Sequence, residues 1–230
     1  MEARHPLASW LRLSLTPGLG AAAQRQLLAA FGLPDAIFDA NHSALAAVVG
    51  SPAARLLLDH DAGEAVTRAL QWADEPGNTL LTLGDPAYPA SLLEIPDPPV
   101  CLYVKGDVAL LSREAIAVVG ARSATPQGEA NAEAFSASLS RGGLGIVSGL
   151  ALGIDAAAHR GGLSGPGRTV AVIGTGADRI YPARNGDLAR RIAAEGAIVS
   201  EFPLGLGPLA HNFPRRNRLI AGLARGVLVV

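Results

Sequence analysis

Apolar residues recur at helical spacing along the first third of the chain. Leu, Ala and Val return every three or four residues between Gly, Pro and Asn positions that interrupt helices, which is the pattern of short amphipathic helices. Helices are therefore expected over residues 7–15, 21–31, 35–38, 43–49, 53–59 and 62–72. Together they predict a small all-helical domain over residues 1–75, which ends at the Asp-Glu-Pro-Gly-Asn turn signal of residues 74–78.

From residue 79 the pattern changes to short apolar runs that alternate with helical segments. Strands are expected over residues 79–83, 100–104, 116–119, 145–148, 169–173, 197–200 and 227–230, with a helical turn at 89–93 and helices over 126–140, 154–160, 185–195 and 216–224. Such alternation is typical of right-handed crossovers. It predicts an α/β domain over residues 76–230, built on a Rossmann-like parallel sheet with helices on both faces.

The turn after residues 116–119 is the first candidate for anion binding. The apolar run stops at Gly120, and a helix is expected to begin near Thr125. Backbone amides at the start of a helix favour an anion, and Arg122 would add a two-pronged contact. Ala121, Arg122 and Ser123 stand where a dinucleotide-binding turn would place further glycines, so the turn is not that fingerprint.

Charge separates the two parts of the chain. Residues 1–112 hold 6 Lys and Arg against 12 Asp and Glu, whereas residues 113–230 hold 13 against 8. The basic second part favours an anionic partner such as nucleic acid. The lone Cys101 excludes an internal disulfide, and the absence of a signal-peptide pattern or a long apolar run predicts a cytoplasmic protein.

The start of the helical domain contains a glycine turn between two predicted helices. The sequence Leu-Thr-Pro-Gly-Leu-Gly of residues 15–20 resembles a helix-hairpin-helix element, in which backbone amides meet a DNA phosphate. This half of the chain is acidic, and only Arg25 lies near the turn. We therefore expect a structural or partner-docking hairpin here.

Four motifs follow the expected strand ends of the second domain. They are Val-Gly-Ala-Arg at 119–122, Ser-Gly-Leu-Ala-Leu-Gly-Ile-Asp-Ala-Ala-Ala-His at 148–159, Val-Ile-Gly-Thr-Gly at 172–176 with Ile-Tyr-Pro-Ala-Arg-Asn at 180–185, and Ser-Glu-Phe-Pro at 200–203 with Asn-Phe-Pro-Arg-Arg-Asn-Arg at 212–218. In this order and spacing they resemble the DNA-processing protein A (Smf) family. The resemblance covers about residues 79–230, and the preceding helical part resembles the sterile-alpha-motif-like domain of that family.

The resemblance implies a DNA-binding site on these motifs. Glycines would let a phosphate approach the main chain, Arg122 would grip it, and Arg184 beside Asn185 would line the same pocket. Phe213 is either a stacking platform for a base or an ordinary core aromatic, and Arg218 either contacts DNA or pairs with Glu201. The full set of expected DNA-binding residues is Gly120, Arg122, Gly149, Gly174, Gly176, Arg184, Asn185, Asn212, Phe213, Arg215, Arg216, Asn217 and Arg218.

The function implied by the resemblance is sequence-independent binding of single-stranded DNA without catalysis. Family members load the RecA recombinase during DNA uptake, natural transformation and recombination, and full-length members form homodimers. Asp155 and His159 lie one helical turn apart, and a structural pair is favoured over a general base because no nucleophile accompanies them. No metal-ligand spacing or cofactor motif is present.

Two other classes of function stay open on sequence. One is a nucleotide-processing phosphoribohydrolase similar to the lysine-decarboxylase-like group, although its Gly-Gly-x-Gly-Thr loop and following Glu are missing. The other is an interaction module in which the helical domain docks a partner. Compared with the family that it resembles, the sequence is expected to stop at Val230 on an interior strand and before the frequent winged-helix-like domain, so it is expected to be either truncated or a fragment. An exposed apolar end strand and reduced stability are therefore expected.

Overall fold

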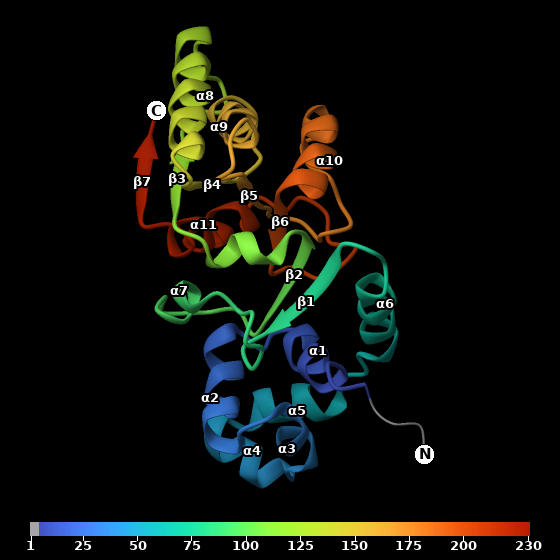
Figure 1. The fold of residues 1–230 in the computed structure, drawn as a ribbon. Coiled ribbons are helices and arrows are strands. Elements are labelled where there is room, and N and C mark those ends of the chain that lie inside the picture. Colours follow the sequence, from blue (N-terminus) through green and yellow to red (C-terminus); the bar gives the residue numbers. More distant parts are fainter. Residues whose placement is uncertain (1–4) are drawn as a thin grey trace. The chain divides into compact units, whose positions relative to one another are not determined.

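The computed structural model describes residues 5–230 and divides them into two compact units (Figure 1). The first unit is helical; it runs up to Glu75 and includes Thr82–Gly84 and Asp97–Cys101. The second unit contains the sheet and comprises Pro76–Leu81, Asp85–Pro96 and Leu102–Val230.

Short helices around a leucine core build the first unit. They are α1 (Ala8–Leu15), α2 (Ala21–Phe31), α3 (Pro34–Asp39), α4 (His42–Val49), α5 (Ser51–Asp59) and α6 (Gly63–Ala73). Leu13, Leu27, Leu45 and Leu57 are fully buried in one cluster, and this burial is the main stabilising contribution to helices too short to persist alone. The Asn41 side chain caps α4 by accepting a hydrogen bond from the Ala44 amide at 3.0 Å.

A seven-stranded sheet forms the centre of the second unit. Its strands are β1 (Asn78–Thr82), β2 (Cys101–Gly106), β3 (Ala115–Val119), β4 (Gly145–Ser148), β5 (Thr169–Val172), β6 (Ala197–Ser200) and β7 (Gly226–Val229), in the order β1-β2-β6-β5-β4-β3-β7. The strands from β6 to β7 in this order are parallel, so the carboxyl ends of β3, β4, β5 and β6 meet at one edge.

The sheet departs from the predicted parallel arrangement at β2, which pairs with β6 in antiparallel orientation. Residues 107–114 join β2 to β3 through the short 3-10 helix η1 (Val108–Ser112). A parallel connection needs a crossover of about a dozen residues or more. This connection is too short to bring the chain back to the starting end of the sheet, so β2 and β3 run in opposite directions.

Helices cover both faces of the sheet, as predicted. Figure 1 shows α8 (Pro126–Arg141), α9 (Ile154–Leu163) and α10 (Gly186–Glu195) on one side and α11 (Asn212–Gly222) on the other. The first side is packed through small and branched residues such as Val118, Ala157 and Ile192. The remaining helical pieces are α7 (Ala90–Leu93) and the 3-10 helix η2 (Ala183–Asn185).

The last strand, β7, lies at the edge of the sheet and pairs with β3. Val227 and Val229 expose most of their side chains, so β7 presents the apolar surface that the sequence predicts. Among the described residues, no helix combines the length and apolar character that would let it cross a membrane.

Candidate functional site

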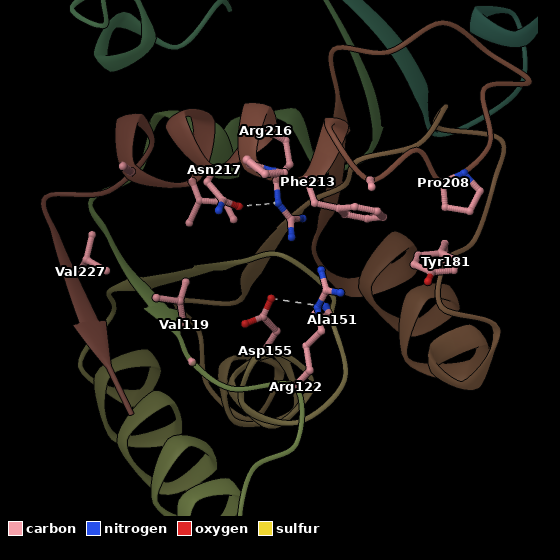
Figure 2. Close-up of a pocket in the computed structure, with 15 residues that line it drawn as sticks. Val119, Arg122, Ala151, Asp155, Tyr181, Pro208, Phe213, Arg216, Asn217 and Val227 are labelled. Atoms are coloured by element: carbon pink, nitrogen blue, oxygen red, sulfur yellow. Dashed lines mark hydrogen bonds between the residues drawn. The ribbon is translucent and has the colours of Figure 1, made fainter.

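A cavity of 630 Å³ lies beyond the carboxyl end of β3 (Figure 2). Its walls come from the turn after β3, the start of α9 with the loop before it, the Tyr181 and 208–210 loops, α11 and β7. The lining residues are Val119, Gly120, Arg122, Ala151, Asp155, Tyr181, Pro208, Ala210, Phe213, Pro214, Arg216, Asn217, Ile220, Ala221 and Val227. A cleft at this edge of a parallel sheet is where the fold places ligands.

Arg122 is the exposed cation of this cavity. It follows Gly120 on the turn after β3, and its Cζ atom lies 5.4 Å from the centroid of the Phe213 ring. Within residues 5–230 its guanidinium has no acidic partner. Figure 2 shows the side chain directed into the cavity, toward Phe213. The cation–π contact orients the guanidinium and leaves its N–H groups available to an anion.

Arg216 is buried, with 4% of its surface exposed, although it lines the same cavity. Its Nη1 donates hydrogen bonds to the carbonyl oxygen of Gly149, at 2.7 Å, and to that of Val172. Burial lowers the pKa of Arg216 to about 10, while the nearby Asp155 carboxylate raises it and Arg122 lowers it. The guanidinium is therefore charged at neutral pH and fixed in place by the main chain.

Asp155 and His159 hold the loop that connects β4 to α9. The amides of Gly149 and Ala151 donate to Asp155 Oδ2 at 3.1 and 3.4 Å, and the amide of Leu150 donates to His159 Nε2 at 3.2 Å. Three successive backbone amides are thus satisfied by two buried side chains on α9. Burial raises the pKa of Asp155, and the charge of Arg216 opposes that rise. Both side chains therefore have a structural role in holding this loop.

The stability of the fold should depend on pH through His159. Burial lowers the pKa of its imidazole from 6.5 to about 3. The unfolded chain therefore takes up a proton that the folded chain excludes, so the stabilisation is complete above pH 6.5 and is lost as the pH falls toward 3, by about 1.4 kcal/mol per pH unit. His159→Gln keeps an acceptor for the Leu150 amide, and its free energy of unfolding should fall less between pH 7 and pH 5 in denaturant titrations. Equal losses in both proteins would contradict this origin.

Two aromatic rings meet at the rim of the cavity. Phe213 is half-buried on the first turn of α11, and its ring centroid lies 5.6 Å from that of Tyr181 at an interplanar angle of 39°. Tyr181 is 43% exposed. Sequence reasoning missed Tyr181 as a site residue, although it lies in the motif at 180–185. The sequence signal that could have indicated Tyr181 is an aromatic residue in the loop that follows a glycine-rich strand end.

Three of the residues expected to bind DNA, Arg184, Asn185 and Asn212, are not among those that line the cavity. Asn185 is buried and donates to the carbonyl oxygens of Leu150 and Ala151 at 2.9 and 3.1 Å. Asn212 is buried and donates to the carbonyl oxygen of Gly174 at 3.1 Å. Both amides therefore fix loops around the cavity. Arg184 is exposed on η2 and is not among the residues that line the cavity.

The three arginines of α11 that were expected to form a charged wall differ in their contacts. Arg218 forms a two-pronged salt bridge with Glu201, with N–O distances of 2.6 and 2.7 Å, and Arg215 approaches the same carboxylate at 3.4 Å. The Glu201 side chain is only 2% exposed, so it requires a cation for compensation, which the close contact with Arg218 supplies. Arg216 faces inward because it shares one helical face with Leu219 and Ile220, which are buried. Asn217 lines the cavity and accepts a hydrogen bond from Arg216 Nε at 2.9 Å.

The glycines of the motifs make room for the protein's own groups. A Cβ atom at Gly149 would lie 2.2 Å from Arg216 Nη2, and one at Gly174 would lie 2.9 Å from Phe213 Cδ1. At Gly120 and Gly176 the added atom would meet the carbonyl oxygens of Val230 and Pro203 at 2.4 and 2.5 Å. Close approach explains these glycines, whereas the sequence argument assigned the space to a phosphate. Gly120 alone among them lines the cavity.

No cluster of three or more His, Cys, Asp or Glu side chains suited to a metal ion occurs in the part of the chain that the structure describes.

Known proteins resemble the chain over both units. Protein Smf of Synechocystis is 40% identical over 97% of this chain and 58% of its own length. The X-ray structure of DNA processing protein A from Streptococcus pneumoniae superposes with a TM-score of 0.82 at 35% identity, covering 96% of this chain and 77% of that one. A structure of DNA processing protein A from Helicobacter pylori, described by its single-stranded DNA binding mode, has a TM-score of 0.60 at 32% identity and covers 65% of this chain and 68% of that one.

The chain spans about half the length of the curated relatives that it matches. Residues 79–230 match the family described as DNA recombination-mediator protein A. This match takes in the whole cavity and every motif that lines it. The chain therefore belongs to the DNA recombination-mediator protein A family.

Proposed function

We propose that the chain binds single-stranded DNA without sequence preference, in the cavity beyond β3. The observation that carries this proposal is the exposed guanidinium of Arg122, which has no acidic partner among the described residues and stands beside aromatic rings. A strand of DNA offers a phosphate to the guanidinium and bases to the aromatic rings. Backbone phosphates carry no base information, so binding through them is independent of sequence.

The charge of the cavity favours an anion. Arg122 and Arg216 both line it, and Asp155 is its one acidic lining residue among those described. The Asp155 carboxylate already accepts two backbone amides and faces the charge of Arg216. Its negative charge is therefore compensated within the protein, and the positive charge of Arg122 is left for the ligand.

Family membership supports the wider role. The relative from Helicobacter pylori is described as binding single-stranded DNA, and the family description names recombination mediation. We propose that the full-length protein delivers the bound strand to RecA recombinase during DNA uptake, natural transformation and recombination, and that it does so as a homodimer. A cytoplasmic site of action fits the single cysteine, Cys101, which is buried and unpaired.

No observation favours the phosphoribohydrolase alternative. Asp155, which lines the cavity, and His159, one helical turn further along α9, both accept hydrogen bonds from backbone amides. Release of ribose 5-phosphate from nucleoside monophosphates would nevertheless test that reading directly, and turnover would replace the DNA-binding proposal.

The binding proposal is tested by titrating a labelled oligonucleotide at several salt concentrations. We expect single strands to bind more tightly than a duplex of the same sequence. The logarithm of the affinity should fall linearly with the logarithm of the salt concentration, because binding releases counterions from the phosphates. Affinity that does not change with salt, or a preference for free mononucleotide, would argue against a strand-binding cavity.

A further inference from the structure

The two rings at the rim of the cavity differ in what they already contact. Phe213 lies under the Arg122 guanidinium, beside the Tyr181 ring and against the backbone of Gly174. The contact with Gly174 is so close that a single added Cβ atom would come within 2.9 Å of Phe213 Cδ1. Phe213 is therefore half-buried and packed by the protein on several sides, so it is less open to a ligand than an exposed ring.

Tyr181 has the opposite character. Its surface is 43% exposed, whereas the other two tyrosines, Tyr88 and Tyr103, are 5% and 2% exposed. Its ring contacts the ring of Phe213, and its hydroxyl has no hydrogen-bond partner among the described residues. It lines the main cavity and also a smaller adjoining one of 60 Å³, which it shares with Arg122 and Phe213. A large ring left open to solvent at a cationic cavity is suited to stack with a planar ligand.

We propose that Tyr181 is the platform on which a base of the bound strand stacks, while Phe213 positions Arg122 for the phosphate. This inference rests on the proposed function. Arg122 and Tyr181 both contact Phe213 (Figure 2), so a phosphate held by the first and a base stacked on the second belong to neighbouring parts of one strand. The two aromatic residues then have separate roles, one toward the ligand and one toward the arginine.

The test compares a thymidine oligonucleotide with an abasic oligonucleotide of equal length. Tyr181→Ala should bind the thymidine strand about tenfold more weakly than the unaltered protein does, because base–aromatic stacking is lost. On the abasic strand, which has no base to stack, the two proteins should bind with equal affinity. Tyr181→Phe should retain the affinity for both strands, because it keeps the aromatic ring and no hydrogen bond among the described residues holds the hydroxyl.

Two further variants separate the roles of the rings. Phe213→Leu should weaken binding of both strands by a similar factor, because it removes the ring that orients the Arg122 guanidinium. Phe213→Tyr keeps an aromatic ring at this position and should retain the affinity. Ile180→Ala removes the exposed neighbour of Tyr181 and should change neither affinity. Thermal unfolding of each variant shows whether it is folded.

The outcomes distinguish this inference from the proposed function. If the unaltered protein binds neither strand, the proposed function fails and the inference fails with it. If it binds, but Tyr181→Ala has no effect or weakens both strands equally, only the role of Tyr181 is overturned. A loss confined to the thymidine strand in Phe213→Leu would assign the stacking to Phe213 instead.

Discussion

Arg216→Ala is expected to lower the free energy of unfolding by about 3–5 kcal/mol, the usual cost of leaving a buried charge without its partner. Removing this guanidinium leaves the buried Asp155 carboxylate without its nearby cation, and it leaves the carbonyl oxygens of Gly149 and Val172 without a donor. Urea denaturation followed by circular dichroism measures the effect.

The neighbouring residue provides the matched control. Arg215 lies next along the same helix, but its side chain is 52% exposed and its contact with Glu201 is 3.4 Å long. Arg215→Ala should therefore cost about 1 kcal/mol or less. Equal losses in the two variants would show that the buried guanidinium has no special role.

A double variant tests the coupling between the buried charges. Asp155→Ala alone removes the acceptor of the Gly149 and Ala151 amides and leaves Arg216 uncompensated. The combined Arg216→Ala and Asp155→Ala protein should lose less stability than the sum of the two single losses, because no unpaired charge remains. Strict additivity would mean that the two groups act separately.

The sequence predicts the sheet positions well because apolar runs report burial directly. Residues 145–148 and 197–200 are strands with the predicted bounds, and the strand predicted at 116–119 begins one residue earlier. Strand direction is a different matter, since an apolar run has the same composition whichever way it points. The antiparallel direction of β2 follows from the short connection at 107–114, and the length of that connection could have predicted it from the sequence.

The site is harder to predict because three arginines on one helix look alike in composition. Their surroundings differ: Arg216 is buried, Arg218 is paired with Glu201, and Arg215 is mostly exposed. The spacing of Arg216 from Leu219 and Ile220 places it on the apolar face, so part of this was readable. The contacts of Asp155 with the 149–151 loop depend on how β4 and α9 pack, which spacing alone does not determine.

Arg122→Ala is expected to weaken binding of single-stranded DNA by about 1.5–3 kcal/mol, the range for hydrogen bonds to a charged group. The guanidinium is exposed, makes no salt bridge within residues 5–230 and faces the cavity, so the proposed phosphate contact is the interaction that the variant would lose. The loss should be similar for oligonucleotides of different sequence. Arg122→Lys should recover only part of it, because an ammonium keeps the charge but not the two-pronged geometry.

The control for Arg122 is another exposed arginine that lies outside the cavity. Arg141 is exposed at the far end of α8, whose first turn follows the Arg122 loop, and Arg141→Ala should leave affinity nearly unchanged at moderate salt. Thermal unfolding measured on the same preparations separates an effect on binding from an effect on folding. Because Arg122 has no acidic partner within residues 5–230, its alanine variant should keep the unfolding midpoint of the unaltered protein. An Arg122→Ala protein that is equally stable and binds oligonucleotide with undiminished affinity would remove this residue from the site.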